Sequence, residues 1–258
     1  MNPPLDITPG AWTVFAPYGW LHGVTLLVCL VLIAAPSLLG RALQKDAARK
    51  NAERSLRYSL AAFAVVVWLA YNIWWNWRGI DWRGGLPLQL CDINGLIAPL
   101  ALVTGWRFAR ATLYFWTAAL TAQAFIQPAL IDGPAFVLFW AFWLSHTIIA
   151  ACAAYDVAVR GFRPGWRDLG IAVLASLIYV ALVLPIDLWL GADYGFVGNP
   201  PAGIIIPPFV AALGPWPQRA IVLVALVPIG FVVVLLPWVV ARVYAQRNRT
   251  VATRLPIG

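Results

Sequence analysis

The residues with the clearest chemical potential lie in one apolar stretch, Leu86–Gly95, which reads LPLQLCDING. This stretch places a thiol (Cys91), a carboxylate (Asp92) and an amide (Asn94) close together along the chain. Polar groups in a membrane-buried segment are energetically costly and usually have a function. His146 lies within another apolar segment. A cysteine and a histidine together predict nucleophilic catalysis, with the imidazole as base and the thiolate as nucleophile.

The elements that position these residues are predicted to be membrane helices. Of 258 residues, 62% are hydrophobic and only 11% are charged. Long apolar runs separated by short basic stretches are typical of a polytopic membrane protein and exclude a soluble domain. We therefore expect an all-α fold, a single integral membrane domain over residues 1–258 with seven transmembrane helices. The predicted spans are residues 18–39, 57–77, 86–105, 110–128, 135–157, 167–189 and 217–241.

The distribution of Lys and Arg predicts the orientation. Most of these residues fall after the first, third, fifth and seventh predicted spans, and the other side of the membrane keeps only Arg78, Arg83 and Arg219. The positive-inside rule then places the N-terminus outside and the C-terminus in the cytoplasm. This topology accounts for the net charge of +8, so no nucleic-acid partner is expected.

Several polar groups are predicted to share one depth in the membrane. Counted from the basic residues at ~1.5 Å per helical residue, they lie roughly 20–24 Å above the cytoplasmic ends, in the outer half of the bilayer. These groups are Asn72, Cys91, Asp92, Asn94, Gln123 and His146. His22 and Gln127 lie slightly further out, and Asn199 lies in a Gly- and Pro-rich outer loop. Apart from Cys91 and His146, all are candidates for contacts to a substrate or an oxyanion.

The start of the third span favours reactivity at Cys91. Pro87 is expected in the first helical turn, where its missing N–H has no cost. Cys91 then lies about one turn into the helix, near the positive end of the dipole, which favours a thiolate. Asn94 and Gly95 are expected on the same helical face as Cys91, with Gly95 leaving space over the thiol. Asp92 points about 100° away and is expected to be a structural partner.

Each of these assignments has a simpler structural alternative. A buried cysteine is most often a packing residue, and Cys29 and Cys152, which lack polar neighbours, are expected to be inert. His146 could equally form an interhelical hydrogen bond, and His22 could simply be a histidine at the membrane interface. The outer-loop acid Asp193 is expected to be solvated. No ligand-pair spacing supports a metal site, and no cofactor is predicted.

The Leu86–Asp92 segment resembles the signature of YwaF-like integral membrane proteins, a bacterial family. Other matching features are His22, His146 and the outer loop from Asp193-Tyr194 to Asn199-Pro200. That family is similar to a eukaryotic transmembrane acyltransferase that places polyunsaturated acyl chains on ether phospholipids through a cysteine and a histidine. More remotely, both resemble small membrane hydrolases that use a threonine in place of the cysteine. By motif position, the resemblance implies that Cys91 and His146 are the catalytic pair.

The resemblance also implies a multi-pass protein of the bacterial cytoplasmic membrane that acts on membrane lipids. The predicted activity is that of a Cys/His lipid acyltransferase or acyl hydrolase, with an outer-leaflet phospholipid or lysolipid as substrate. The chain departs from the family at Gln89, where the signature has histidine. Glutamine donates and accepts hydrogen bonds but does not shuttle protons at neutral pH.

Two other classes of function stay open from the sequence. A small-molecule transporter or receptor would use the polar layer to bind its ligand, although transporters more often show internal repeats. A non-catalytic membrane scaffold would use the same groups only for hydrogen bonds between helices. The sequence gives no oligomeric state.

Overall fold

The regular structure of this chain is helical. The structure, a computed structural model, describes residues 10, 12–199 and 206–252. Within these residues the regular structure outside the helices is an isolated antiparallel bridge between Val14 and Asp132. The short helices are η1 (Ala47–Arg49), α5 (Gln123–Ile126), η3 (Tyr194–Phe196) and α8 (Pro208–Ala211). The all-α prediction is thus confirmed for the described part of the chain.

Five helices of the described chain are long and apolar enough to cross a membrane. They are α1 (Trp20–Gln44), α2 (Lys50–Asn76), α6 (Val137–Ala158), α7 (Trp166–Leu190) and α9 (Gln218–Ala252). They match the first, second, fifth, sixth and seventh predicted spans. Apolar side chains are exposed along their surfaces, as is expected of helices that face lipid. The protein is therefore a multi-pass integral membrane protein.

The third predicted span is a helix shorter than expected, and the fourth is divided into three helical segments. The third is α3 (Leu90–Thr104), which has 15 residues. The fourth is divided into α4 (Arg107–Phe115), the π-helical turn η2 (Trp116–Thr121) and α5. Gly105, with a φ of +68°, ends α3 in the left-handed conformation that favours glycine.

The expectation that Pro87 lies in the first helical turn is wrong. Gln89 precedes α3 with an extended backbone, at φ −60° and ψ 147°. The Leu88 N–H bonds to the Leu86 carbonyl at 2.7 Å, and the Tyr179 hydroxyl donates to the Leu88 carbonyl at 2.8 Å. These contacts hold the segment before α3 in a turn.

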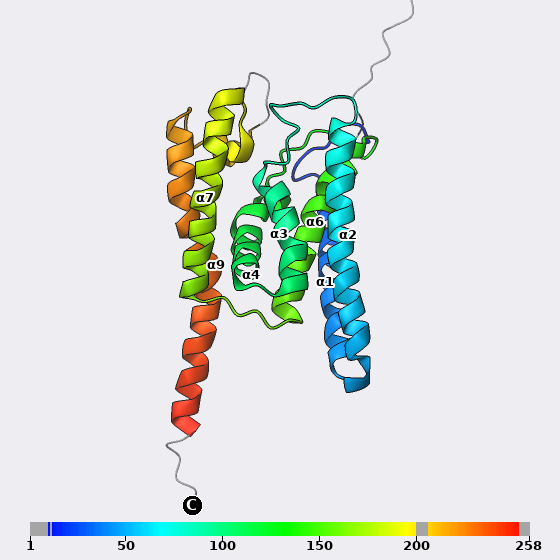
Figure 1. The fold of residues 1–258 in the computed structure, drawn as a ribbon, viewed down its shortest axis with the longest axis vertical. Coiled ribbons are helices and arrows are strands. Elements are labelled where there is room, and N and C mark those ends of the chain that lie inside the picture. Colours follow the sequence, from blue (N-terminus) through cyan, green and yellow to red (C-terminus); the bar gives the residue numbers. More distant parts are fainter. Residues whose placement is uncertain (1–9, 11, 200–205, 253–258) are drawn as a thin grey trace, which may run out of the picture.

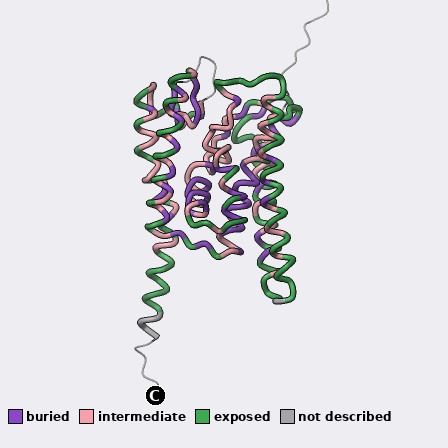
Figure 2. The backbone as a smooth tube through the Cα atoms, viewed as in Figure 1, coloured by how far each residue is buried: buried purple, intermediate pink, exposed green. Residues whose placement is uncertain are grey.

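The helices pack side by side along the long axis of the molecule. In Figure 1, α3, α4 and α6 occupy the centre, with α1 and α2 on one side and α7 and α9 on the other. We call the top of Figure 1 the upper end; it holds the connections 77–89, 127–136 and 191–199. The lower end holds the connections 105–106 and 159–165. Figure 2 shows that buried residues concentrate in the central helices.

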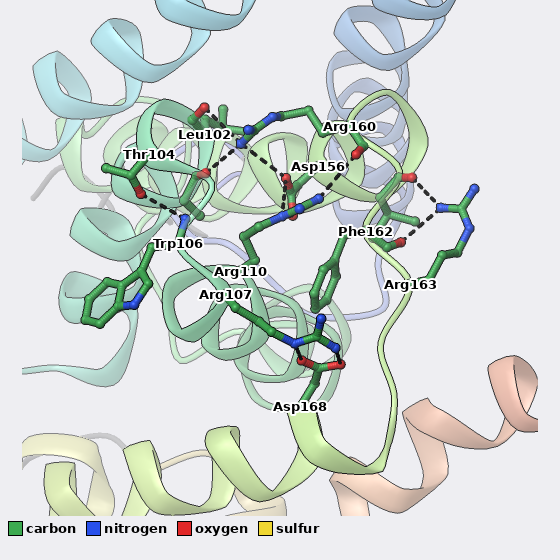
Figure 3. A network of polar contacts seen from close by, with 12 residues as sticks. Leu102, Thr104, Trp106, Arg107, Arg110, Asp156, Arg160, Phe162, Arg163 and Asp168 are labelled. Atoms are coloured by element: carbon green, nitrogen blue, oxygen red, sulfur yellow. Dashed lines mark hydrogen bonds and ion pairs between the residues drawn. The ribbon is translucent and has the colours of Figure 1, made fainter.

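Arginines at the lower end join the helices through paired carboxylates. Arg107 on α4 forms two bonds to Asp168 on α7, at 2.7 and 2.8 Å, and Arg110 bonds to Asp156 on α6 at 2.8 Å. Arg160 donates to carbonyl oxygens near the end of α3 (Figure 3). Bidentate charged pairs of this kind fix geometry as well as contributing energy. These contacts therefore connect α3, α4, α6 and α7 to one another at the lower end.

Candidate functional site

A cavity of about 620 Å³ lies among the helices toward the upper end. Its lining comes from α2, α3, η2, α5, α6, α7 and α9, and from connections at the upper end. A volume of several hundred Å³ is typical of sites for small ligands. The lining includes five residues that the sequence predicts for the site: Cys91, Asp92, Gln123, Gln127 and His146. The thiol-bearing and imidazole-bearing helices, α3 and α6, thus contribute to the same space.

Cys91 is the second residue of α3, close to the positive end of the helix dipole. Its thiol lies close to the hydroxyl of Thr121 in η2. The Asn94 amide donates to Thr121 at 3.2 Å and to Thr117 at 3.1 Å. Asn94 is fully buried and does not line the cavity. It lies behind the cysteine, as a link between α3 and η2.

The π-helical turn presents both threonines to Asn94. Its widened geometry is marked by the bond from the Ala122 N–H to the Thr117 carbonyl, five residues back, at 2.9 Å. Turns of this type occur mostly as single insertions in α-helices and are frequent at functional sites. η2 therefore helps to position the first turns of α3, which carry Cys91, through the two bonds to Asn94.

His146 on α6 is buried, and one of its ring nitrogens is occupied. Nδ1 lies 2.6 Å from the Phe142 carbonyl oxygen. Because a carbonyl oxygen only accepts, Nδ1 carries the proton and, in the uncharged ring, Nε2 carries the lone pair. Nε2 forms no hydrogen bond with the described residues. The imidazole is therefore held by its own helix in the tautomer that a general base requires.

Asp92 stabilises the start of α3. Its carboxylate lies close to the Gln89 N–H at the start of the helix. Its carbonyl oxygen accepts from the Trp68 indole at 2.9 Å. Gly95 packs against the same indole, because a Cβ there would lie 3.0 Å from Trp68 Cδ1. Because Gly95 has no side chain, Trp68 packs closely against its backbone. Gly95 also lines the cavity.

Three further candidates lie outside the cavity lining. His22 uses both ring nitrogens: Nδ1 accepts from the Tyr18 N–H and Nε2 bonds to the Phe125 carbonyl, each at 3.0 Å. Asn72 donates to the carbonyl of Trp68 on its own helix, at 2.9 Å. Asn199 is exposed. The structure thus brings these residues to helix contacts or to the surface, and not to the cavity.

Apart from Ser176, the polar side chains that line the cavity lie toward the upper end, beside apolar ones such as Phe209 and Val210, and the lining below them is apolar. The chain runs toward the upper end from α4 through η2 to α5, and along it Gln123 and Gln127 follow the apolar lining residues Ala119 and Leu120. On α6, His146 lies about one turn above Ile149. Ser176 is a polar exception at depth, but its hydroxyl is bonded to the Ala172 carbonyl and the Trp116 indole. Such a space fits an amphiphile, with its polar group near the upper end.

Asp193 is buried, so the expectation of a solvated acid is wrong. Arg219 at the start of α9 pairs with it at 3.2 Å and also donates to the Gly198 carbonyl at 2.8 Å. Burial raises the pKa of the Asp193 carboxyl to about 6, while Arg219 acts in the opposite direction. This pair joins the start of α9 to the segment that follows α7, and Asp193 also lines the cavity.

Sequence reasoning missed Thr121, Tyr179 and Arg219. Threonine in a membrane helix commonly bonds to its own backbone, so its type carries little signal. Arg219, one of only three basic residues on the predicted outer side, was a usable signal. An unpaired arginine there predicts an acidic partner, and Asp193 lies in the adjoining connection.

The chain has recognisable relatives. An uncharacterized protein of Treponema pallidum (strain Nichols) is 28% identical over 204 residues, which cover 76% of this chain and 81% of that protein. No solved structure matches. The sequence profile of the TMEM164 family matches residues 17–236, a range that includes Cys91, His146 and every residue that lines the cavity. This chain belongs to the TMEM164 family.

Proposed function

We propose that this protein is a membrane-embedded lipid acyltransferase that uses Cys91 as the nucleophile and His146 as the general base. The observation that carries the proposal is that both side chains line one cavity, with His146 Nε2 free to accept a proton. The polarity of the cavity supports a lipid substrate, with its ester near the reacting pair and its acyl chain below. An acyl hydrolase would use the same first step with water as the acceptor.

The proposal includes seven membrane crossings, with the upper end outside and the lower end in the cytoplasm. The two crossings beyond the five long helices are α3 and the combined passage of α4, η2 and α5. The arginines of the lower end support this orientation by the positive-inside rule. The reacting pair would then meet the outer leaflet. An impermeant maleimide should label Gly79→Cys on intact cells, and labelling of Lys45→Cys instead would reverse the orientation.

In the first half-reaction, His146 Nε2 takes the proton of the Cys91 thiol. The sulfur attacks the carbonyl carbon of a lipid ester and forms a tetrahedral intermediate. When the ester C–O bond breaks, the leaving lipid oxygen takes the proton from His146. The products are a lysolipid and an acyl thioester on Cys91.

In the second half-reaction, His146 takes the proton of a lysolipid hydroxyl or of water. That oxygen attacks the thioester carbonyl, the C–S bond breaks and the sulfur recovers the proton from His146. Backbone N–H groups in the first turn of α3, or the Gln123 amide, which lines the cavity, would stabilise the oxyanion. Asn94 is not proposed for this role because it does not line the cavity.

The resemblance of the Leu86–Asp92 segment to YwaF-like proteins, and through them to a transmembrane ether-phospholipid acyltransferase, supports the same pair. The matching cysteine and histidine positions are Cys91 and His146.

The test is turnover of a labelled phospholipid by purified protein in detergent or vesicles. Cys91→Ala should abolish acyl release and transfer, and His146→Ala should lower them by about 10²–10⁴-fold, the usual contribution of a general base. Cys152→Ala is the matched control, because Cys152 is buried and does not line the cavity. Full activity of Cys91→Ala would refute the mechanism. Saturable lipid binding without any turnover would favour a receptor or transporter.

A further inference from the structure

Gln89 has almost all of its hydrogen-bonding groups occupied. Its backbone N–H lies close to the Asp92 carboxylate. Its carbonyl oxygen accepts from the N–H groups of Asp92 at 2.9 Å and Ile93 at 3.1 Å. Its side-chain Oε1 accepts from the Gly195 N–H at 3.0 Å. The group left over is the side-chain NH₂, which forms no hydrogen bond with the described residues.

The side chain of Gln89 is held from outside its own helix. Gly195 has a φ of +65°, and a Cβ at this position would collide with the Tyr179 hydroxyl, so glycine is required. The same Tyr179 hydroxyl donates to the carbonyl of Leu88, the residue before Gln89. Two contacts from α7 and its following connection therefore fix the segment that leads into α3.

Gln89 lines the same cavity as Cys91, two residues later, and as His146. Its side-chain oxygen is fixed by Gly195, so the unpaired NH₂ is a preorganised donor in a space that holds a nucleophile and a base. A donor of this kind, which faces the cavity, is matched by an acceptor on a ligand.

We infer that the Gln89 amide donates a hydrogen bond to the carbonyl oxygen of the acyl group that is transferred at Cys91. This inference rests on the proposed function. As the bond between sulfur and the carbonyl carbon forms, the π electron pair moves onto the oxygen, which becomes negative. A fixed donor stabilises this charge without having to reorient. Gln89 is thereby a catalytic residue that neither takes up nor releases a proton.

The experiment compares Gln89→Glu and Gln89→Leu in the purified full chain, with a labelled phospholipid as substrate. Glutamate keeps an oxygen for the Gly195 N–H but, as a carboxylate, has no N–H to donate, whereas leucine removes both functions. We expect kcat to fall about 100-fold in both variants with little change in KM, because an oxyanion donor acts in the transition state. Near-normal activity of Gln89→Glu, with loss only in Gln89→Leu, would mean that Gln89 merely anchors the connection.

A second measurement distinguishes loss of the Gln89 hydrogen-bond donor from the effect of the negative charge that Gln89→Glu adds. The ester carbonyl oxygen is replaced by sulfur, a weak hydrogen-bond acceptor. Wild-type protein should prefer the oxygen ester, and Gln89→Leu should lose most of that preference. An unchanged preference would overturn the inference. If Cys91→Ala is inactive and Gln89→Glu is fully active, Gln89 alone is wrongly assigned, whereas a wild type without turnover refutes the proposed function as well.

Discussion

At the scale of single residues, the chemistry of the site depends on which atom of each side chain is left free. The Phe142 carbonyl occupies Nδ1 of His146 and so leaves Nε2 as the acceptor. The Thr121 hydroxyl lies between the Cys91 thiol and the Asn94 amide. The proposed catalytic pair, which comes from two helices, is thus held by neighbours to which no reactive role is assigned.

Thr121→Val should weaken both stability and reactivity. The substitution keeps the shape of the side chain but leaves the buried Asn94 amide with one acceptor fewer, at a cost of about 1–3 kcal/mol. We expect a lower Tm and a changed rate of Cys91 alkylation by a membrane-permeant reagent. The control is Thr25→Val, because the Thr25 hydroxyl bonds to the Leu21 carbonyl on its own helix. Equal effects of the two substitutions would contradict the role of Thr121.

The contrast between these threonines explains what the sequence could predict. Cys91 and His146 stand out because reactive groups are rare in apolar segments, and the sequence predicted both as lining one site. Thr25 and Thr121 have similar apolar surroundings along the chain, yet only Thr121 reaches the cysteine. That difference arises from tertiary packing, which a single sequence does not display.

At the scale of elements, the boundaries of α3 and of the segment from α4 to α5 depend on contacts with residues that are distant in the sequence. The five long helices follow from uninterrupted apolar length, so the sequence predicts them well. The start of α3 is set by Tyr179, far along the chain, through its bond to Leu88. For this reason local propensity at Pro87 predicted a helical turn that is not present.

α9 should control which acyl chains the cavity accepts. Gly230 lines the cavity roughly 18 Å below the start of α9, at ~1.5 Å per residue. Gly230→Ala should be tolerated, since its Cβ would meet only the Ala119 Cβ, at 3.6 Å. Gly230→Phe should lower turnover of long acyl chains relative to short ones by about tenfold, within the range for apolar pockets.

Competition between two labelled phospholipids of different chain length, in the same vesicles, measures this preference directly. Gly230→Ala is the matched control for loss of glycine without filling of the cavity. An unchanged preference in Gly230→Phe would mean that the acyl chain does not extend to α9.

At the scale of the whole molecule, the two ends are built differently. The lower end is closed by several arginine–carboxylate pairs between helices, whereas the upper end has the buried pair of Asp193 and Arg219 over the cavity. The sequence predicted the concentration of basic residues at one end. It did not predict the partners on other helices, because Asp156 and Asp168 are distant in sequence from Arg110 and Arg107, respectively.

Asp193 should give stability a distinct pH dependence. Its folded-state pKa is about 6, above the usual value near 3.8. Between about pH 4 and 6 the folded protein retains a proton that the unfolded chain releases, so the contribution of Asp193 to the free energy of unfolding falls as pH rises. The Tm of wild type minus that of Asp193→Asn should therefore decrease across this range. A difference that increases would contradict the burial of Asp193.

The central claim is that Cys91 carries the acyl group between two lipids. Intact-protein mass spectrometry after brief incubation with a phospholipid tests it most directly. We predict one added acyl mass in wild type, located at Cys91 by peptide analysis, released by hydroxylamine and absent from Cys91→Ala. Lipid turnover at an undiminished rate with no acyl group on Cys91 would contradict the account.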